Sequence, residues 1–223
     1  MPQQPITITA AEVIDLRVPT SDQMLGSDPF HVAPDYSSAV LHLETDVGLR
    51  GVSVVFTIGA GTDWMCHGIR DLCQLVIGTT LDEFTDSPFK LYKRLIDHHQ
   101  LRWLHDGVFR MAAGAVLNAM WDLWAKSRNE PLWKLLVDLE PNFVADCIDW
   151  RNLGDALTRE EAIALLQARR ANVAQREIAL TERGPKAYCT AGWLGLSDEE
   201  ILATIRKLQA EGFDAFKLKV GQN

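Results

Sequence analysis

Alternating apolar and polar positions near the N-terminus predict three β-strands, which span about residues 6–18, 38–44 and 51–56. The first strand contains an irregularity at the pair Ala10-Ala11, and Pro19 ends it. A turn at residues 46–48 joins the second strand to the third, so the pattern predicts an antiparallel three-stranded meander. The loop at residues 20–35 is rich in Ser, Asp, Gly and Pro, and loops of this length are usually functional or disordered.

The spacing of apolar residues becomes helical after residue 60. It predicts helices over about residues 62–76, 81–86, 88–97 and 107–128, and a further short helix that begins at Pro131. The helix at 107–128 has the clearest pattern, and the small residues on its apolar face permit the close approach of another backbone. Strands followed by helices indicate an α+β unit, a three-stranded meander plus a helical bundle, that ends near Asp138.

The order of the elements changes after Pro141, which predicts a second domain. Short strands are expected at residues 145–150, 187–191 and around 213–220. Two helices are expected between them. One runs from Thr158, which with Glu161 has a capping-box pattern, to about Leu180, and the other is capped by Ser197-Asp-Glu-Glu200 and runs to about Glu211. Strand, helix and strand in this order are typical of a parallel βαβ unit. We therefore expect domains at residues 1–140 and 141–223.

The most informative chemistry lies in the last predicted strand, where Lys217 and Lys219 are two residues apart. Side chains at positions i and i+2 of a strand share one face, so both ammonium groups are expected on the same side. Two like charges on one half-buried face are unfavourable unless an anion lies between them. The spacing is thus consistent with a carboxylate substrate and with one lysine of lowered pKa acting as a base. The alternative is a polar edge strand with two solvated lysines.

Composition excludes several classes of function. The chain of 223 residues is 47% apolar and carries a formal charge of −8, which argues against nucleic acid and against an anionic membrane as partners. No apolar run approaches the roughly 20 residues of a membrane span, and Met-Pro-Gln-Gln-Pro lacks the features of a signal peptide, so we expect a cytoplasmic protein. Four cysteines at positions 66, 73, 147 and 189 show no paired spacing, and we expect reduced core thiols.

Other candidate sites are weaker. Gly59-Ala-Gly61 lacks the third glycine of a dinucleotide loop, because Trp64 stands there, and is better explained as a tight turn before a helix. His98, His99 and His105 lack the spacing of metal ligands and are expected in a surface loop. Motifs for nucleophilic serine, threonine or cysteine catalysis and for phosphate-binding loops are absent from the sequence.

The polar residues of the 20–35 loop are candidates for a lid over a ligand. Asp28, His31 and Asp35 lie there together with Tyr36, and polar loop residues beside an aromatic ring are common in binding sites. Asp22, Glu44 and Asp46 are expected to be solvated turn residues instead.

Eight short motifs occur along the chain in a characteristic order. They are Pro19-Thr-Ser, Gly26-Ser-Asp, Pro34-Asp-Tyr-Ser37, Gln100-Leu-Arg-Trp103, Asn118-Ala-Met-Trp-Asp-Leu-Trp-Ala-Lys126, Pro131-Leu-Trp-Lys-Leu135, Gly192-Trp-Leu-Gly195 and Phe216-Lys-Leu-Lys-Val-Gly221. Together these motifs resemble L-fuconate dehydratase, in the mandelate racemase/muconate lactonizing branch of the enolase superfamily. The resemblance covers essentially the whole chain, in order and at compatible spacing.

The resemblance implies a fold and a site. Residues 1–140 would be the α+β capping domain, and residues 141–223 the first strands and helices of an incomplete (β/α) TIM-type barrel. Lys219 would be the base that takes the proton α to the substrate carboxylate. Lys217 would hold that carboxylate and depress the pKa of Lys219, while Gly26 and Tyr36 would contact the acid sugar. The implied reaction is Mg²⁺-dependent dehydration to a 2-keto-3-deoxy sugar acid.

The length of the chain departs from the family pattern. A complete barrel takes about 250 residues, whereas 81 residues follow position 142 (223 − 142). We therefore assign no metal ligand within this chain, expect the Mg²⁺ ligands beyond residue 223, and expect the chain alone to be inactive. A homo-oligomer is expected, as is usual in the family. The alternatives are another acid-sugar dehydratase or racemase of the superfamily, or a non-catalytic truncated product that acts by association.

Overall fold

The computed structural model describes residues 4–104 and 106–221 and divides into two compact units. Unit 1 comprises the described residues of Met1–Leu16, Ser38–Phe56 and Gly61–Val173. Unit 2 comprises those of Arg17–Ser37, Thr57–Ala60 and Ala174–Asn223. The segment between the first two strands therefore groups with the C-terminal elements. The division into domains at residue 140 stays a prediction.

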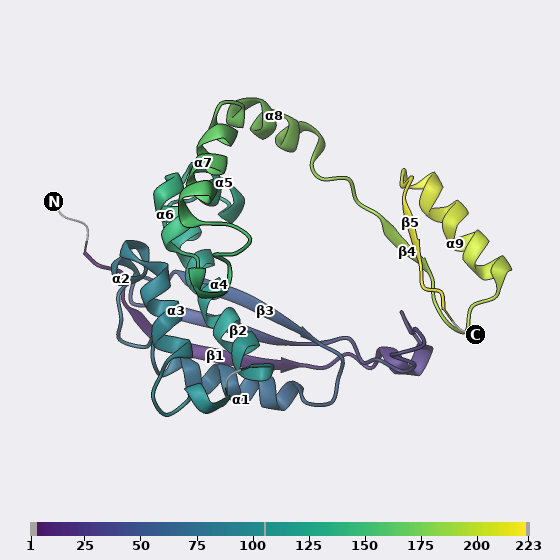
Figure 1. Ribbon diagram of the computed structural model, residues 1–223. Helices are drawn as coiled ribbons and strands as arrows, with labels where there is room; N and C mark the ends of the chain where they lie inside the picture. Colours follow the sequence, from purple (N-terminus) through teal and green to yellow (C-terminus); the bar gives the residue numbers. More distant parts are fainter. Residues whose placement is uncertain (1–3, 105, 222–223) are drawn as a thin grey trace. The chain divides into compact units, whose positions relative to one another are not determined.

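The predicted meander is confirmed. Strands β1 (Ile8–Leu16), β2 (Ser37–Thr45) and β3 (Arg50–Thr57) form one sheet in the order β1-β2-β3 (Figure 1). β1 and β2 are antiparallel, and their register shifts between Ile8 and Ala10, where the sequence predicted an irregularity. Buried and partly exposed residues alternate along the whole of β2, which is the expected period of a strand with one face on the core.

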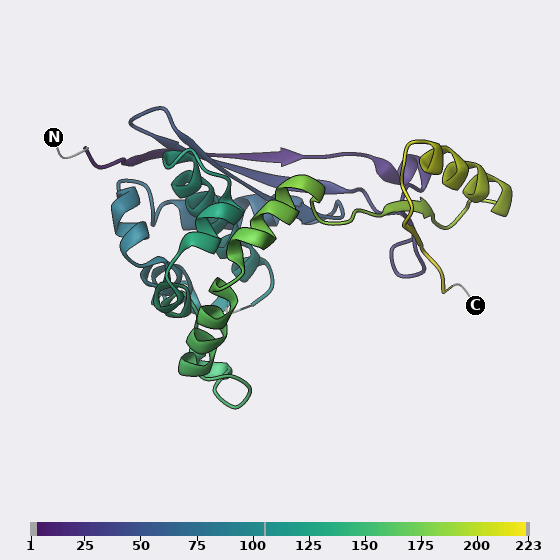
Figure 2. The ribbon, with the colours of Figure 1, turned by 90° about the horizontal axis from the view of Figure 1, so that it is seen from above.

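Seven helices follow in the described part of unit 1: α1 (Thr62–Cys73), α2 (Leu81–Asp86), α3 (Pro88–Ile96), α4 (Val108–Ser127), α5 (Leu132–Asp138), α6 (Pro141–Asp146) and α7 (Arg159–Arg170). Two short 3₁₀ helices, η2 (Arg102–Leu104) and η3 (Trp150–Asn152), lie between them. The view in Figure 2 shows the helices of this unit gathered on one side of the strands. This leaves the other face of the sheet uncovered within unit 1, where Val54 and Phe56 are exposed.

Helix α4 forms the centre of the core, as its apolar pattern predicted. Its buried face carries small residues, and the carbonyl oxygen of Ala119 lies so close to β3 that a Cβ atom on Gly51 would be only 2.3 Å from it. Polar bonds fix the same contact, because Asp122 accepts a hydrogen bond from the Val52 amide at 2.7 Å and Lys126 Nζ donates to the Arg50 carbonyl at 2.9 Å. Helix and strand are therefore held at backbone contact.

The strand predicted at residues 145–150 is wrong. The segment forms the end of α6 and the 3₁₀ helix η3, and the Trp150 indole donates to the Ala145 carbonyl at 2.9 Å. A short apolar run does not distinguish strand from helix by its period. Pro141 decides the outcome here, because it occupies the first turn of α6, where its fixed φ favours a helix and its missing N–H is not needed.

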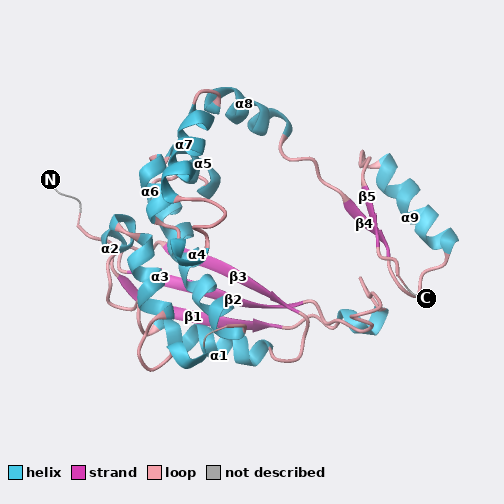
Figure 3. Cartoon of the chain, viewed as in Figure 1, coloured by secondary structure: helices cyan, strands magenta, loops and turns pink. Residues whose placement is uncertain are grey.

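Unit 2 contains most of α8 (Val173–Arg183), together with β4 (Cys189–Gly192), α9 (Asp198–Ala210), β5 (Phe216–Leu218) and the 3₁₀ helix η1 (Thr20–Gln23) (Figure 3). β4 and β5 are parallel, and α9 packs on β4, which confirms the predicted βαβ unit. The single helix predicted from Thr158 to Leu180 is instead two, because residues 171 and 172 form a turn between α7 and α8. The predicted capping box at Thr158 is present, and Ser197, predicted to cap α9, forms a second capping box with Glu200.

The four cysteines are free thiols, as predicted. Cys66 and Cys73 are buried in the core, and burial raises the pKa of Cys73 to about 12. Cys147 and Cys189 are only partly buried, so the prediction of four core positions holds for two. Within residues 4–104 and 106–221, none of the helices combines the length and the hydrophobicity needed to span a lipid bilayer.

The contact between α4 and β3 gives a stability prediction. Gly51→Ala places a methyl group against the Ala119 carbonyl, and overpacking of this kind should destabilise the protein by about 1–3 kcal/mol. Gly114→Ala, in α4 itself, meets no atom within 4 Å and should stabilise by roughly 0.5–1 kcal/mol, because alanine is the better helix former. Urea unfolding midpoints of the two variants should therefore move in opposite directions. Equal midpoints would contradict the close approach.

Candidate active site

Local hydrogen bonds give the 17–37 segment, the part of unit 2 between β1 and β2, a defined path. Thr20 Oγ1 donates to the Pro34 carbonyl at 2.7 Å and accepts from the Tyr36 amide at 2.8 Å. Asp35 accepts from both the amide and the hydroxyl of Ser21, and these bonds lower its pKa. These hydrogen bonds join residues 20 and 21 to residues 34–36, so the two ends of the loop lie side by side.

The loop also bonds to the C-terminal part of unit 2. Ser27 is fully buried, its hydroxyl donates to the Leu194 carbonyl at 3.3 Å, and the Leu194 amide donates to the Ser27 carbonyl at 3.3 Å. This reciprocal pair docks the loop on the turn between β4 and α9. The sequence analysis missed it, although both residues lie in motifs that carry the family resemblance, and only the three-dimensional structure brings them together.

Lys219 lies directly after β5 and meets the 17–37 segment. Its amide continues the ladder by donating to the Gly192 carbonyl at 2.9 Å. Its ammonium donates to the Tyr36 hydroxyl at 2.8 Å, to an Asp28 carboxylate oxygen at 3.2 Å and to the Gly26 carbonyl. The side chain is only 15% exposed. The structure thus brings together three of the four predicted site residues, Lys219, Tyr36 and Gly26.

Glycine is required at position 26 by both backbone and space. Its φ of +66° lies in the left-handed region, and a Cβ atom there would sit 2.6 Å from Cε2 of Tyr36. The Tyr36 hydroxyl donates to the Gly26 carbonyl at 2.5 Å. The hydroxyl end of the ring therefore packs against a position that has no side chain, and the same hydroxyl contacts Lys219.

Asp28 is the acidic residue of the site. One carboxylate oxygen accepts hydrogen bonds from the Phe30 amide at 3.0 Å, the His31 amide at 2.8 Å and the His31 ring at 3.2 Å, while the other accepts from Lys219. The His31 amide is the largest cause of a pKa lowered to about 2, and the Lys219 ammonium adds to it. The lid residues predicted in this loop therefore have different positions: Asp28 contacts Lys219, His31 contacts Asp28, and Asp35 holds the base of the loop.

The expectation that Lys219 has a depressed pKa is wrong for this structure. The hydrogen bond to Tyr36 and the bond and charge of Asp28 raise the pKa of Lys219, and its partial burial only opposes them. The lowered pKa was expected from the positive charge of Lys217. In the structure, the charged group in contact with Lys219 is instead the carboxylate of Asp28, from a loop far away in the chain. Lys217 itself lies on β5, opposite Thr190, and its exposed side chain has no hydrogen bond or ion pair with the described residues.

The described residues of this site do not fit a Mg²⁺ ion. Mg²⁺ requires near-octahedral oxygen ligands, and the one carboxylate at Lys219, that of Asp28, is already occupied by an ammonium and three further donors. The absence of Mg²⁺ ligands from residues 1–223 stays a prediction.

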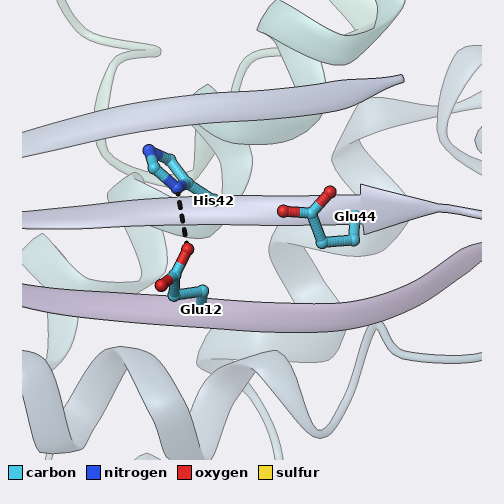
Figure 4. Close-up of side chains that lie close together, drawn as sticks. All are labelled: Glu12, His42 and Glu44. Atoms are coloured by element: carbon cyan, nitrogen blue, oxygen red, sulfur yellow. Dashed lines mark hydrogen bonds and ion pairs between the residues drawn. The ribbon is translucent and has the colours of Figure 1, made fainter. Parts of the chain in front are cut away.

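Elsewhere in the described residues, one group brings possible metal ligands within 4.8 Å of one another: Glu12, His42 and Glu44, on β1 and β2. Figure 4 shows Glu12 directed at His42, with 3.1 Å between carboxylate and ring, while Glu44 lies farther along β2. Glu44 is paired with Arg50 at 2.7 Å. The prediction of Glu44 as a solvated turn residue is therefore wrong, because it lies in a strand and in a cross-strand ion-pair group.

The predicted turn at Gly59-Ala-Gly61 is present before α1, with φ of +109° and +86° at its glycines. His98 and His99 lie in a turn, with ring centroids 4.7 Å apart. His105 lies outside the described residues.

Comparison with known proteins identifies the family. A sequence model described as the mandelate racemase/muconate lactonizing enzyme N-terminal domain matches residues 13–137, more than half of the chain. The chain belongs to the mandelate racemase/muconate lactonizing enzyme family. Its meander and helices are accordingly the N-terminal capping domain of the enolase superfamily.

Curated members of the superfamily match along nearly the whole chain. Mitochondrial enolase superfamily member 1 of Xenopus laevis is 42% identical over 219 residues, which is 96% of this chain and 49% of the relative. L-galactonate dehydratase of Hypocrea jecorina is 41% identical over 220 residues, which is 97% of this chain and 49% of the relative. The chain thus spans about half the length of the curated relatives it matches. The resemblance noted in the sequence is confirmed for the superfamily and not for L-fuconate dehydratase in particular.

Solved structures agree on the fold of this family member. The crystal structure of human mitochondrial enolase superfamily member 1 matches with a TM-score of 0.93 at 38% identity and covers 98% of this chain and 51% of that chain. L-talarate/galactarate dehydratase of Salmonella typhimurium, liganded with Mg and L-lyxarohydroxamate, matches with a TM-score of 0.66 at 16% identity, over 98% of this chain and 45% of that chain. At 16% identity the second match shows the fold alone.

The contact between Asp28 and Lys219 has a defined pH range. Because the pKa of Asp28 is lowered to about 2, the contact contributes stability at pH values above the ordinary range of aspartate and loses it as the pH falls through about 2. Carboxyl ¹³C NMR of Asp28 should give this midpoint. In Lys219→Met the midpoint should rise only part of the way to its ordinary value, because the His31 amide remains. A midpoint near 4 in the unmodified protein would contradict the geometry.

Proposed function

We propose that the whole protein is an acid-sugar dehydratase, which removes a proton from the carbon α to a carboxylate and expels the β-hydroxyl as water. The observation that carries the proposal is a largely buried lysine, Lys219, at the C-terminal end of β5, covered by the 17–37 segment and its Gly26-Tyr36 pair. An amine held at the end of a strand under a polar loop is the arrangement expected of a general base in a shielded site. Similarity to L-galactonate dehydratase supports the same reaction class.

Each residue of the site has a proposed role. Lys219 takes the α-proton once it has lost its own proton. Lys217, exposed and without an ion-pair partner among the described residues, is available to bind the substrate carboxylate. Tyr36 and the Gly26 carbonyl line the covering loop and can contact sugar hydroxyls. Breaking the α C–H bond and the β C–O bond yields an enol and water, and the enol tautomerises to a 2-keto-3-deoxy acid.

The remaining parts of the machinery are proposed from family membership. The parallel unit of β4, α9 and β5 is proposed to be the beginning of a (β/α) barrel, in which active sites lie at the C-terminal ends of the strands. Mg²⁺ is proposed as the cofactor, held by ligands outside residues 1–223, and relatives of the same fold were crystallised with it. A cytoplasmic location and a homo-oligomeric state also remain proposals.

Two substrates fit the proposal, and they differ by one hydroxyl group. L-fuconate is the 6-deoxy form of L-galactonate, so the two share the configuration of the carbons at which the reaction occurs. The motifs of the sequence favour L-fuconate, whereas the name of a relative that is 41% identical favours L-galactonate. We therefore propose an acid sugar of this configuration and leave the group at carbon 6 to experiment.

The test is turnover by the full-length protein that carries this chain. With Mg²⁺ present, L-galactonate or L-fuconate should yield a 2-keto-3-deoxy acid, detected as its semicarbazone. Lys219→Arg should lower kcat by about 10²–10⁴-fold, the usual contribution of a positioned base, because a guanidinium does not accept a proton. Lys207→Arg, on an exposed face of α9, is the matched control and should retain full activity.

Solvent deuterium separates dehydration from the alternative of racemisation. A racemase would place deuterium on the α-carbon without loss of water, whereas a dehydratase forms the keto acid. Activity of Lys219→Arg equal to that of the unmodified protein on every acid sugar tried would rule out the proposed base.

A further inference from the structure

The ammonium group of Lys219 has as many hydrogen-bond acceptors as it has protons. Its three N–H groups face the Tyr36 hydroxyl at 2.8 Å, an Asp28 carboxylate oxygen at 3.2 Å and the Gly26 carbonyl. The Tyr36 ring also lies under the charge, with 5.5 Å from Nζ to its centroid. This is a complete set of partners for a protonated lysine.

The same arrangement suits a neutral amine less well. A neutral amine has two N–H groups and one lone pair, and the lone pair needs a donor. Among these three partners only the Tyr36 hydroxyl can donate, and to do so it must give up its 2.5 Å hydrogen bond to the Gly26 carbonyl. That loss, together with the negative charge of Asp28 at 3.2 Å, favours the ammonium form, which is unable to accept the α-proton of a substrate.

Asp28 is built to stay charged in this position. Three donors, the amides of Phe30 and His31 and the His31 ring, bind one of its oxygens and leave the other directed at Lys219. The carboxylate is thus oriented by its own loop rather than by the lysine. The charged and titratable groups that face Lys219 are Asp28 and Tyr36, with His31 behind Asp28.

We propose that Asp28 is a positioning residue that keeps Lys219 in its protonated, non-basic form while the 17–37 segment covers it, so that the lysine becomes a base only when a bound ligand replaces the Asp28 contact. The inference rests on the proposed role of Lys219 as the base. It adds that the 17–37 segment supplies a counter-ion for Lys219, the carboxylate of Asp28, as well as covering it. A carboxylate or hydroxyl group of an acid sugar is the kind of ligand able to take over the contact.

The experiment measures the titration of Lys219 in the ligand-free, full-length protein. Trace acetic anhydride reacts only with neutral amines, so the labelling of each lysine as a function of pH, measured by peptide mass spectrometry, gives its titration midpoint. Lys217 is an internal reference in the same peptide. Asp28→Asn keeps the acceptor oxygen of the loop and removes the charge. Its Lys219 midpoint should fall, with about threefold to tenfold more labelling at a pH below the midpoint.

Two further variants make the result decisive. Asp22→Asn removes the same charge from an exposed position of the same segment and should leave the Lys219 midpoint unchanged. Tyr36→Phe removes the acceptor at 2.8 Å and should lower the midpoint independently, so the test survives a failure of Asp28→Asn to fold.

The curve of Lys219 labelling against pH separates the outcomes. If Asp28→Asn only makes Lys219 more accessible to the reagent, the maximum labelling will rise while the titration midpoint stays in place, and that result overturns the inference. An equal shift of the midpoint in Asp22→Asn also overturns it. No substrate is needed, so a failed titration leaves the proposed dehydratase standing. Conversely, if the full-length protein is inactive on acid sugars but Asp28→Asn shifts the Lys219 midpoint, the proposed function is wrong and the role of Asp28 as the counter-ion of Lys219 stands.

Discussion

Backbone contact between α4 and β3 is the constraint on which the capping domain depends. A side chain on Gly51 would collide with the Ala119 carbonyl, so the helix packs against the strand at a distance that only small residues permit. The bonds of Asp122 and Lys126 to the backbone of β3 fix the helix along the strand. The sheet that results sets where β1 ends and β2 begins. The 17–37 segment is joined to these two strand ends, and its own base is closed by the hydrogen bonds of Thr20 and Asp35.

The candidate site combines two opposed requirements. A base needs a lone pair, yet Lys219 has neighbours that stabilise its proton. Exposure does not explain this, because the side chain is only 15% exposed, and the effect comes from specific partners on one loop. In the mechanism proposed above, a base that is protonated at rest and freed by its ligand would be shielded from unproductive chemistry between turnovers. The 17–37 segment would then link access to the site with the reactivity of Lys219.

Much of the fold could be predicted from sequence because the decisive signals are local. The meander, the small-residue face of α4, the capping box at Thr158, the helix cap at Ser197 and the βαβ unit each follow from the order of apolar, polar and turn residues in neighbouring segments, and the structure contains all of them. The errors occur where local signals are weak. The apolar run at 145–150 is compatible with both the helical and the strand period. Helix α7 has only Ala162 buried, so little packing stabilises a continuation of the helix beyond residue 170.

The candidate site was predictable only in part, for the same reason. Its residues Lys219, Tyr36 and Gly26 were identified from motifs, and the structure brings them together. The predicted direction of the pKa shift of Lys219 was wrong because the shift depends on Tyr36 and Asp28, which are 183 and 191 residues away in the chain. No local pattern encodes a contact of that separation. Ser27 and Leu194, which dock the loop, escaped notice for the same reason.

The fit between Gly26 and the ring of Tyr36 restricts how this site can diverge. A methyl group at position 26 would occupy the volume of the ring, so any larger residue there requires the ring of Tyr36 to move or to be replaced by a smaller side chain. Moving the ring would also displace the hydroxyl that bonds Lys219. Positions 26 and 36 are therefore coupled, and a substitution at one changes which residues the other tolerates.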